Sequence, residues 1–238
     1  MSTAPPPPPG YEPPPGGYGG PPAGGWDLGA ALSYTWAKFQ DNMGQLVLAT
    51  IGVWVAVAIV GIASTGLLVA LADAGTPWLL RSLLQAALYG AVFVVAQLIA
   101  AALIRGSLSI TEGRDFFAVD AFKFAQVGPV LVTALLVGAA TAVGYVFCVL
   151  PGIAIAFLTM YSLYFVVDED LPPVEAITAS FNLVKDNLGN ALLWWLVGGL
   201  IAVAGFVLCF VGALVTIPFV LIGTAYTYKV LTRQPVAD

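Results

Sequence analysis

The segment ALSYTWAKFQDNMG at residues 31–44 has a second copy, AITASFNLVKDNLG, at residues 176–189. Both copies end in Asp-Asn, an apolar residue and Gly, and a long hydrophobic run follows each. At about 100° per residue, their apolar side chains fall on one narrow helical face. That predicted face consists of Leu28, Leu32, Trp36, Phe39 and Met43 in the first copy and of Ile177, Phe181, Val184 and Leu188 in the second. Such a face directly before a hydrophobic run predicts an interfacial amphipathic helix that leads into a transmembrane hairpin.

The composition of the chain excludes an ordinary soluble domain. Of its 238 residues, 60% are hydrophobic and 9% are charged, against roughly 45–50% and 25% in soluble domains. A soluble core of this size cannot bury so much apolar surface, so we expect the chain to lie in lipid. Histidine is absent from the sequence, which removes the commonest general base and metal ligand. A net charge of −5 offers no basic face for nucleic acid. We therefore expect a membrane protein without a cofactor or a nucleic-acid partner.

A change in composition near residue 25 divides the chain into two regions. Residues 1–25 consist largely of Pro and Gly, which build neither a helix nor a packed core. We expect a disordered cytoplasmic tail with polyproline II character. This tail is either a docking segment for a partner protein, with Tyr11 and Tyr18 as contacts, or a solvated segment without a fixed partner. Residues 26–238 form the predicted transmembrane domain.

Six hydrophobic runs follow one another in this second region, each long enough, or nearly so, to cross a core of about 30 Å. We expect them to pair as residues 45–71 with 79–104, 129–149 with 151–167, and 190–209 with 211–231, the second pair turning at Leu150-Pro151-Gly152. Gly128 aligns with Gly189, and Cys148 with Cys209, at one common offset, which indicates an internal repeat. The sequence thus predicts an all-α polytopic membrane helical bundle of six transmembrane helices in three tandem hairpins with interfacial lead-in helices. The middle lead-in, residues 116–127, is degenerate.

Lys and Arg are divided unevenly between the two predicted sides of the membrane. Only Arg81 lies in a loop on the far side, whereas the other basic residues share the side of the termini. By the positive-inside rule this split predicts a multi-pass protein of the bacterial plasma membrane with both termini in the cytoplasm.

The predicted spans hold few residues that suggest chemistry. No Asp, Glu, Lys or Arg lies in the middle of a predicted span. Gln85 and Gln97 are the strongest polar intramembrane candidates; they either line a path for a lipid or solute or make interhelical hydrogen bonds. Cys148 and Cys209 lie at similar depth and either form a disulfide or are two buried small hydrophobic residues. No nucleophile–base pair is evident, so we expect no enzyme activity.

Large aromatic residues lie near the predicted cytoplasmic span ends, where amphipathic rings prefer the headgroup region. The predicted interfacial anchors are Trp36, Phe181, Trp194 and Trp195.

A family resemblance rests on a set of residues in the second half of the chain. These are Leu150-Pro151-Gly152, Tyr161, Tyr164, Asp168–Pro173, Glu175-Ala176 and Ser180. Together they resemble the membrane domain fused to some glycerophosphodiester phosphodiesterases, and stand-alone Gram-positive membrane proteins similar to it. The Pro/Gly/Tyr-rich tail resembles actinobacterial members. The catalytic domain of those phosphodiesterases has no match here, so the resemblance implies no catalytic residue.

Two functions of different classes fit the sequence. The first is a non-catalytic membrane scaffold or accessory subunit, which the tail and the uncharged span interiors favour. The alternative is a carrier or flippase of a lipid or apolar solute, which the tandem hairpins and Gln97 favour. The expected partners are membrane lipids and, through the N-terminal tail, other membrane proteins.

Overall fold

The structure is a computed structural model that describes residues 18–19, 25–114, 126–207 and 211–237. Its helices are α1 (Leu28–Asp73), α2 (Trp78–Thr111), α4 (Val127–Phe147), α5 (Val149–Leu158), α6 (Ser162–Asp168), α7 (Pro173–Asp186), α8 (Leu188–Val207) and α9 (Ala213–Leu231). Six segments are long and apolar enough to cross a membrane, with α5 and α6 together forming the fourth. The predicted all-α polytopic bundle is therefore confirmed, and the chain is a multi-pass membrane protein.

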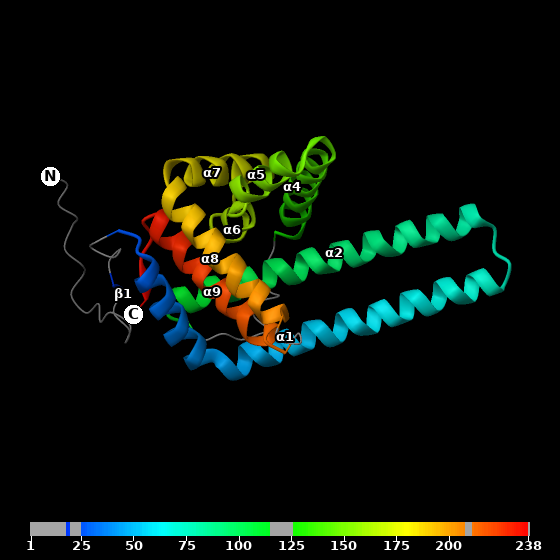
Figure 1. Cartoon of the computed structure of the whole chain (residues 1–238), viewed down its shortest axis with the longest axis horizontal. Helices are drawn as coiled ribbons and strands as arrows, with labels where there is room; N and C mark the ends of the chain where they lie inside the picture. The colour runs from blue at the N-terminus through cyan, green and yellow to red at the C-terminus, as the bar shows by residue number, and fades with distance from the viewer. Residues whose placement is uncertain (1–17, 20–24, 115–125, 208–210, 238) are drawn as a thin grey trace.

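Helix α9 occupies the centre of the bundle, where it packs against α1, α2 and α8. The α4–α5 hairpin lies to one side together with α6 and α7 (Figure 1). The outer parts of α1 and α2 leave the bundle as a long projection that is closed at its far end by the turn between them (Figure 1). The bundle thus has a packed base and a protruding hairpin.

The first lead-in helix is not separate from its span. The sequence predicts a boundary at Gly44, but α1 continues through it as one helix of 46 residues. The second copy does divide, because α7 ends at Asp186 and α8 begins at Leu188. The Asn side chain of both copies makes the same contact: Asn42 and Asn187 each donate to the carbonyl four residues earlier, at 3.0 Å. The similarity of the two copies is therefore limited to the lead-in segment itself. After it, the first copy continues as one helix and the second is followed by a new helix.

The buried face of the two copies shares Phe39 and Val184 with the predicted apolar face. Trp36 is 51% exposed and Phe181 is 43% exposed, so both side chains are accessible to the headgroup region, and their role as interfacial anchors stays a prediction. The side chains that are buried occupy equivalent positions in both copies: Ala31, Thr35 and Phe39 in α1, and Ala176, Ser180 and Val184 in α7. Small and hydroxyl-bearing side chains let helices approach closely in lipid, where apolarity itself does not mark the inside.

Ser180 also explains why the fourth span is divided. The sequence predicts one helix over residues 151–167, but the regular helix is interrupted between α5 and α6, where Met160 and Ser162 donate to the carbonyls three residues earlier. The hydroxyl of Ser180 donates to the Leu158 carbonyl at 2.9 Å and accepts from the Tyr161 N–H at 3.1 Å. Because the hydroxyl satisfies one acceptor and one donor at the interruption, the break costs little in a buried setting.

The turn before this span lies earlier than predicted. Helix α4 ends at Phe147, Cys148 is extended, and α5 already begins at Val149. Pro151 therefore lies in the first turn of α5, where its missing N–H has no intrahelical partner to lose. Gly152 packs directly against the ring of Tyr145, which leaves no room for a side chain.

Parts of the predicted organisation lie outside the described residues. These are residues 1–17 and 20–24 of the tail, most of the middle lead-in, and Cys209. Two tail residues that are described form strand β1 (Tyr18–Gly19), which pairs antiparallel with strand β2 (Val236–Ala237). This part of the tail thus contacts the C-terminal segment.

Candidate functional site

The residues singled out from the sequence do not form one site. Gln85 and Gln97 both lie on α2, and the Gln85 amide donates to the Tyr89 hydroxyl of the same helix at 3.2 Å. Cys148 is exposed at the break between α4 and α5, which does not fit a buried hydrophobic residue. Its pairing with Cys209 stays a prediction, because Cys209 lies outside the described residues.

The two predicted tryptophan anchors of α8 have different surroundings. Trp194 is 1% exposed, and its indole N–H donates to the Thr224 hydroxyl of α9 at 3.0 Å. Its ring lies against Gly223, where any side chain would collide with it. Trp194 is therefore a core residue, and its predicted place in the headgroup region is wrong. Trp195 is partly buried and packs edge-on against Phe157.

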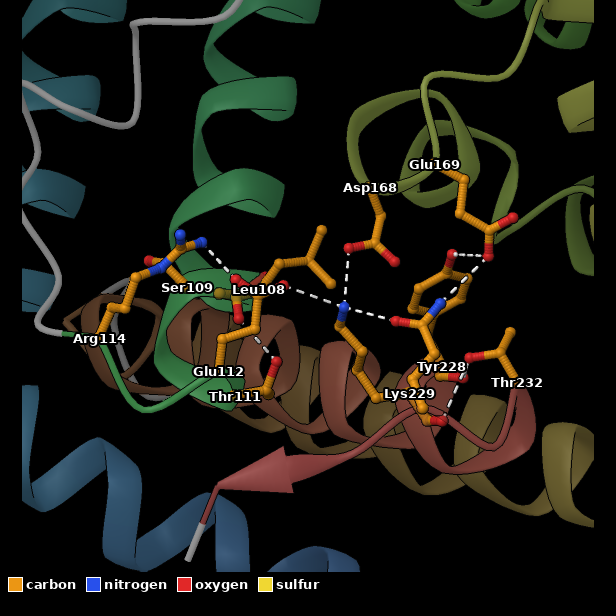
Figure 2. A network of polar contacts seen from close by, with 12 residues as sticks. Leu108, Ser109, Thr111, Glu112, Arg114, Asp168, Glu169, Tyr228, Lys229 and Thr232 are labelled. Carbon is orange, nitrogen blue, oxygen red and sulfur yellow. Dashed lines mark hydrogen bonds and ion pairs between the residues drawn. The ribbon is translucent and has the colours of Figure 1, made fainter. Parts of the chain in front are cut away.

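The strongest concentration of polar contacts lies around Lys229, in the last turn of α9 (Figure 2). Lys229 is only 4% exposed. Its ammonium group donates to Asp168 Oδ1 at 2.7 Å, to Glu112 Oε1 at 3.1 Å and to Gln234 Oε1 at 2.6 Å. An ammonium group has three N–H donors, so all the hydrogen bonds of Lys229 are satisfied. The side chains of Lys229, Asp168, Glu112 and Gln234 are called the lysine cluster below.

The lysine cluster joins the C-terminal ends of three helices. Asp168 is the last residue of α6, Glu112 directly follows α2, and Lys229 lies in the last turn of α9. Helix C-termini carry a partial negative charge, and the two carboxylates add to it. The buried ammonium group of Lys229 offsets this negative charge. Its interaction with the helix ends and the two carboxylates accounts for a lysine at a position where burial alone would disfavour a charge.

The same backbone feature ends all three helices. Gly113, Asp170 and Arg233 follow the C-caps of α2, α6 and α9, and all have positive φ, at 75°, 54° and 58°. After α9, the Gln234 N–H donates to the Lys229 carbonyl at 2.8 Å, as in a Schellman motif. This reversal of the chain returns the Gln234 side chain to the ammonium group of Lys229.

A second layer of contacts surrounds the lysine cluster. Gln234 uses its amide nitrogen to donate to Glu169 Oε1 at 3.1 Å, and the Tyr228 hydroxyl donates to the same oxygen at 3.2 Å. Arg114 forms an ion pair with Glu112. A cavity of about 260 Å³ opens between Glu112, Arg114, Lys229, Gln234 and Pro235. Because each donor of Lys229 already has a partner, the cluster holds helices together more readily than it binds a ligand.

Lys229 lies in the last turn of α9, whereas its place among the basic residues on the side of the termini predicts a loop charge and no cluster. The sequence feature that indicates the cluster is an ionisable residue inside an apolar run, Tyr228-Lys229-Val230-Leu231. Acidic residues, Glu112 and Asp168, follow the second and fourth predicted spans. Over residues 18–19, 25–114, 126–207 and 211–237, no group of His, Cys, Asp and Glu is arranged to hold a metal ion.

Two mycobacterial proteins align with nearly the whole chain. The uncharacterized protein Rv2560 of Mycobacterium tuberculosis is 33% identical over an alignment 250 residues long. The alignment includes 98% of this chain and 75% of that protein. The chain belongs to the Rv2560 family. Uncharacterized protein Mb2590 of Mycobacterium bovis, with the same identity and coverage, belongs to the same set of relatives.

Other comparisons add no further relative to the Rv2560 family. No family model matches the chain, and no solved structure matches it. The resemblance to the membrane domain of glycerophosphodiester phosphodiesterases therefore stays a prediction.

Substitution of Lys229 tests the importance of the lysine cluster. We expect Lys229→Met to destabilise the protein by about 3–5 kcal/mol, because it leaves the buried Asp168 carboxylate without its cation and leaves Glu112 with Arg114 alone. The matched control is Lys185→Met, at an exposed position of α7, and we expect it to change stability by less than about 0.5 kcal/mol. The measurement is thermal unfolding of the purified protein in mild detergent. Equal unfolding temperatures for the two variants would show that the cluster contributes nothing.

Proposed function

We propose that this chain is a non-catalytic membrane scaffold whose protruding α1–α2 hairpin packs against the transmembrane helices of a partner membrane protein. The observation that supports this proposal is the large apolar surface of the hairpin that the chain itself leaves uncovered. The exposed side chains include Ile51, Val55, Val57, Ile59, Val60, Ile62, Leu67 and Val69 on α1, and Leu79, Leu80, Leu83, Leu84, Val92, Phe93, Val94 and Val95 on α2.

The exposed residues of α1 surround the helix instead of forming one lipid-facing stripe. Val55 and Val57 lie about 200° apart around the helix axis, and Val60 lies between them. In the most hydrophobic part of α1 only 11% of the residues are buried, whereas 50% are buried in that of α9. Transmembrane helices gain stability from van der Waals packing against other helices, and the outer part of α1 lacks most of that packing within its own chain.

The packed base supplies the rigidity that a scaffold needs. The lysine cluster holds the C-terminal ends of α2, α6 and α9 together. Because α2 is also one of the two helices of the hairpin, the hairpin is attached to the bundle through a helix whose end is fixed. The carrier alternative rests on the tandem hairpins and on Gln97, which is partly buried on α2; the other polar candidate, Gln85, makes its hydrogen bond within α2.

We further propose that the protein lies in a bacterial plasma membrane with both termini in the cytoplasm. The distribution of Lys and Arg supports this orientation. The convergence of the ends of α2, α6 and α9 in one cluster also supports it, because these helices end the second, fourth and sixth spans.

Photo-crosslinking tests the scaffold proposal. We place a photoreactive amino acid at Ile62, which is 75% exposed on the hairpin, and a matched one at Leu135, which is exposed on α4. The proposal predicts that Ile62 forms a discrete adduct with one membrane protein, joined within one of its transmembrane segments, and that Leu135 reacts with lipid alone. Mass spectrometry of the adducts reads this out.

Two results of that experiment contradict the proposal. If Ile62 reacts with lipid alone, as Leu135 does, the hairpin has no protein partner. If the adduct contains a second copy of this chain, the hairpin is a homodimer surface.

Cysteine labelling tests the orientation. In a Cys148→Ala/Cys209→Ala background, a membrane-impermeant thiol reagent added to intact cells is expected to modify Ala74→Cys, in the turn after α1. The same reagent is expected to spare Val174→Cys, an exposed position at the start of α7. Modification of Val174→Cys in intact cells would contradict the proposed topology. So would an Ala74→Cys that stays unmodified in intact cells but is modified once the cells are lysed.

A further inference from the structure

Three polar side chains follow one another along α2, from its outer part toward the bundle. Gln85, Tyr89 and Gln97 are spaced by multiples of four residues, so they lie on one of the rows with which a helix packs against another helix. Tyr89 is 60% exposed, and Gln85 and Gln97 are partly exposed. These three side chains are called the polar row below, and the helices of the chain itself leave it accessible.

The polar row carries hydrogen-bonding groups that the chain does not satisfy. The Gln85 amide donates to the Tyr89 hydroxyl at 3.2 Å. Among the described residues, that contact leaves the O–H of Tyr89 without an acceptor and the Gln85 carbonyl oxygen without a donor. Gln97 has no hydrogen bond to any described residue. Polar groups in hydrocarbon are costly when they stay unpaired, so the row calls for a partner that can form hydrogen bonds.

The depth of the polar row removes it from the headgroup region. Arg81 precedes Gln85 by four residues, and the cation of such a side chain extends toward the membrane surface. At 1.5 Å per residue, Tyr89 lies about 12 Å and Gln97 about 24 Å further along the helix than Arg81. Even with Arg81 at the edge of the hydrocarbon core, both positions fall within its thickness of about 30 Å. Tyr89 in particular lies where neither water nor a lipid headgroup offers a hydrogen bond.

A transmembrane helix of another protein offers what acyl chains lack. A path for a polar solute needs walls on its other sides, but the outer part of α2 projects away from the bundle (Figure 1). Val92 and Phe93, which lie beside the row, are exposed apolar residues. Apolar packing around a few polar side chains that bond across the contact is typical of helix–helix association in membranes.

We propose that the polar row is the part of the hairpin that recognises the partner protein, through uncharged amide or hydroxyl side chains on one of the partner's transmembrane helices. Uncharged groups fit because Gln85, Tyr89 and Gln97 carry no charge that would neutralise a buried ion. The inference rests on the scaffold function proposed above and adds the chemistry of the contact.

Apolar replacements of similar size test the polar row. The triple variant Gln85→Leu/Tyr89→Phe/Gln97→Leu removes its hydrogen-bonding groups. These groups face lipid in the isolated chain, so we expect the unfolding temperature of the purified variant in detergent not to fall. The matched control is Gln45→Leu/Tyr145→Phe, which changes the same types of side chain at exposed positions outside the row.

Photo-crosslinking from Ile62 reads out the effect of these variants, because Ile62 lies on α1 and leaves the row on α2 unaltered. Three interhelical hydrogen bonds of ordinary strength change an affinity by about 20-fold. We therefore expect the crosslinked fraction in intact cells to fall about ten-fold or more in the triple variant and to stay unchanged in the control. A photoreactive residue in place of Phe93 is expected to join the partner within one helical turn of an Asn, Gln, Ser or Thr.

The outcomes separate this inference from the scaffold function. Capture at Ile62 that the triple variant leaves unchanged would overturn the role of the row alone, as would a Phe93 adduct in a segment without Asn, Gln, Ser or Thr. A lower unfolding temperature of the purified triple variant would also overturn it, because the row would then be satisfied within the chain. If wild-type Ile62 captures no protein, or only a second copy of this chain, both proposals fail.

Discussion

A lysine buried among the ends of three helices is the constraint on which this bundle depends. Moving an ammonium group out of water is costly, and only close partners with full hydrogen bonding offset that cost. Lys229 meets the requirement with Asp168, Glu112 and Gln234. Each partner comes from a different segment, so the cation can be satisfied only when α2, α6, α9 and the C-terminal segment are all in place. The cluster therefore specifies the arrangement of the helix ends.

This constraint organises the rest of the fold. Positive φ at Gly113, Asp170 and Arg233 ends the three helices, and the Lys229 contacts then hold these ends together. Ser180 fixes α7 to the break between α5 and α6, while the Trp194 indole fixes α8 to α9. With its base held together in this way, the chain carries the protruding apolar α1–α2 hairpin.

The sequence predicts the number of membrane-spanning segments well, because long apolar runs without charge have few structures open to them in lipid. Ala31 and Ala176, at equivalent places in the two lead-in segments, are both buried, and the internal repeat as a whole stays a prediction. The sequence misplaces Trp194, which is buried in the core, because large apolar side chains are as stable against protein as against lipid, so the sequence does not distinguish a ring that faces the membrane from one that faces α9. The lysine cluster escapes prediction for another reason: its members, Glu112, Asp168 and Lys229, are far apart in the chain, and only the tertiary fold brings them together.

The most direct measurement of the central claim is a double-mutant cycle between Lys229 and Asp168, with Lys229→Met, Asp168→Asn and the double variant compared by unfolding in detergent. We expect strong coupling: the double variant loses less stability than the sum of the two single variants, by about 1–3 kcal/mol. The same cycle with Lys185→Met in place of Lys229→Met is expected to be additive, because Lys185 is exposed on α7. Additive losses for Lys229 and Asp168 would contradict the account, since the two side chains would then contribute independently.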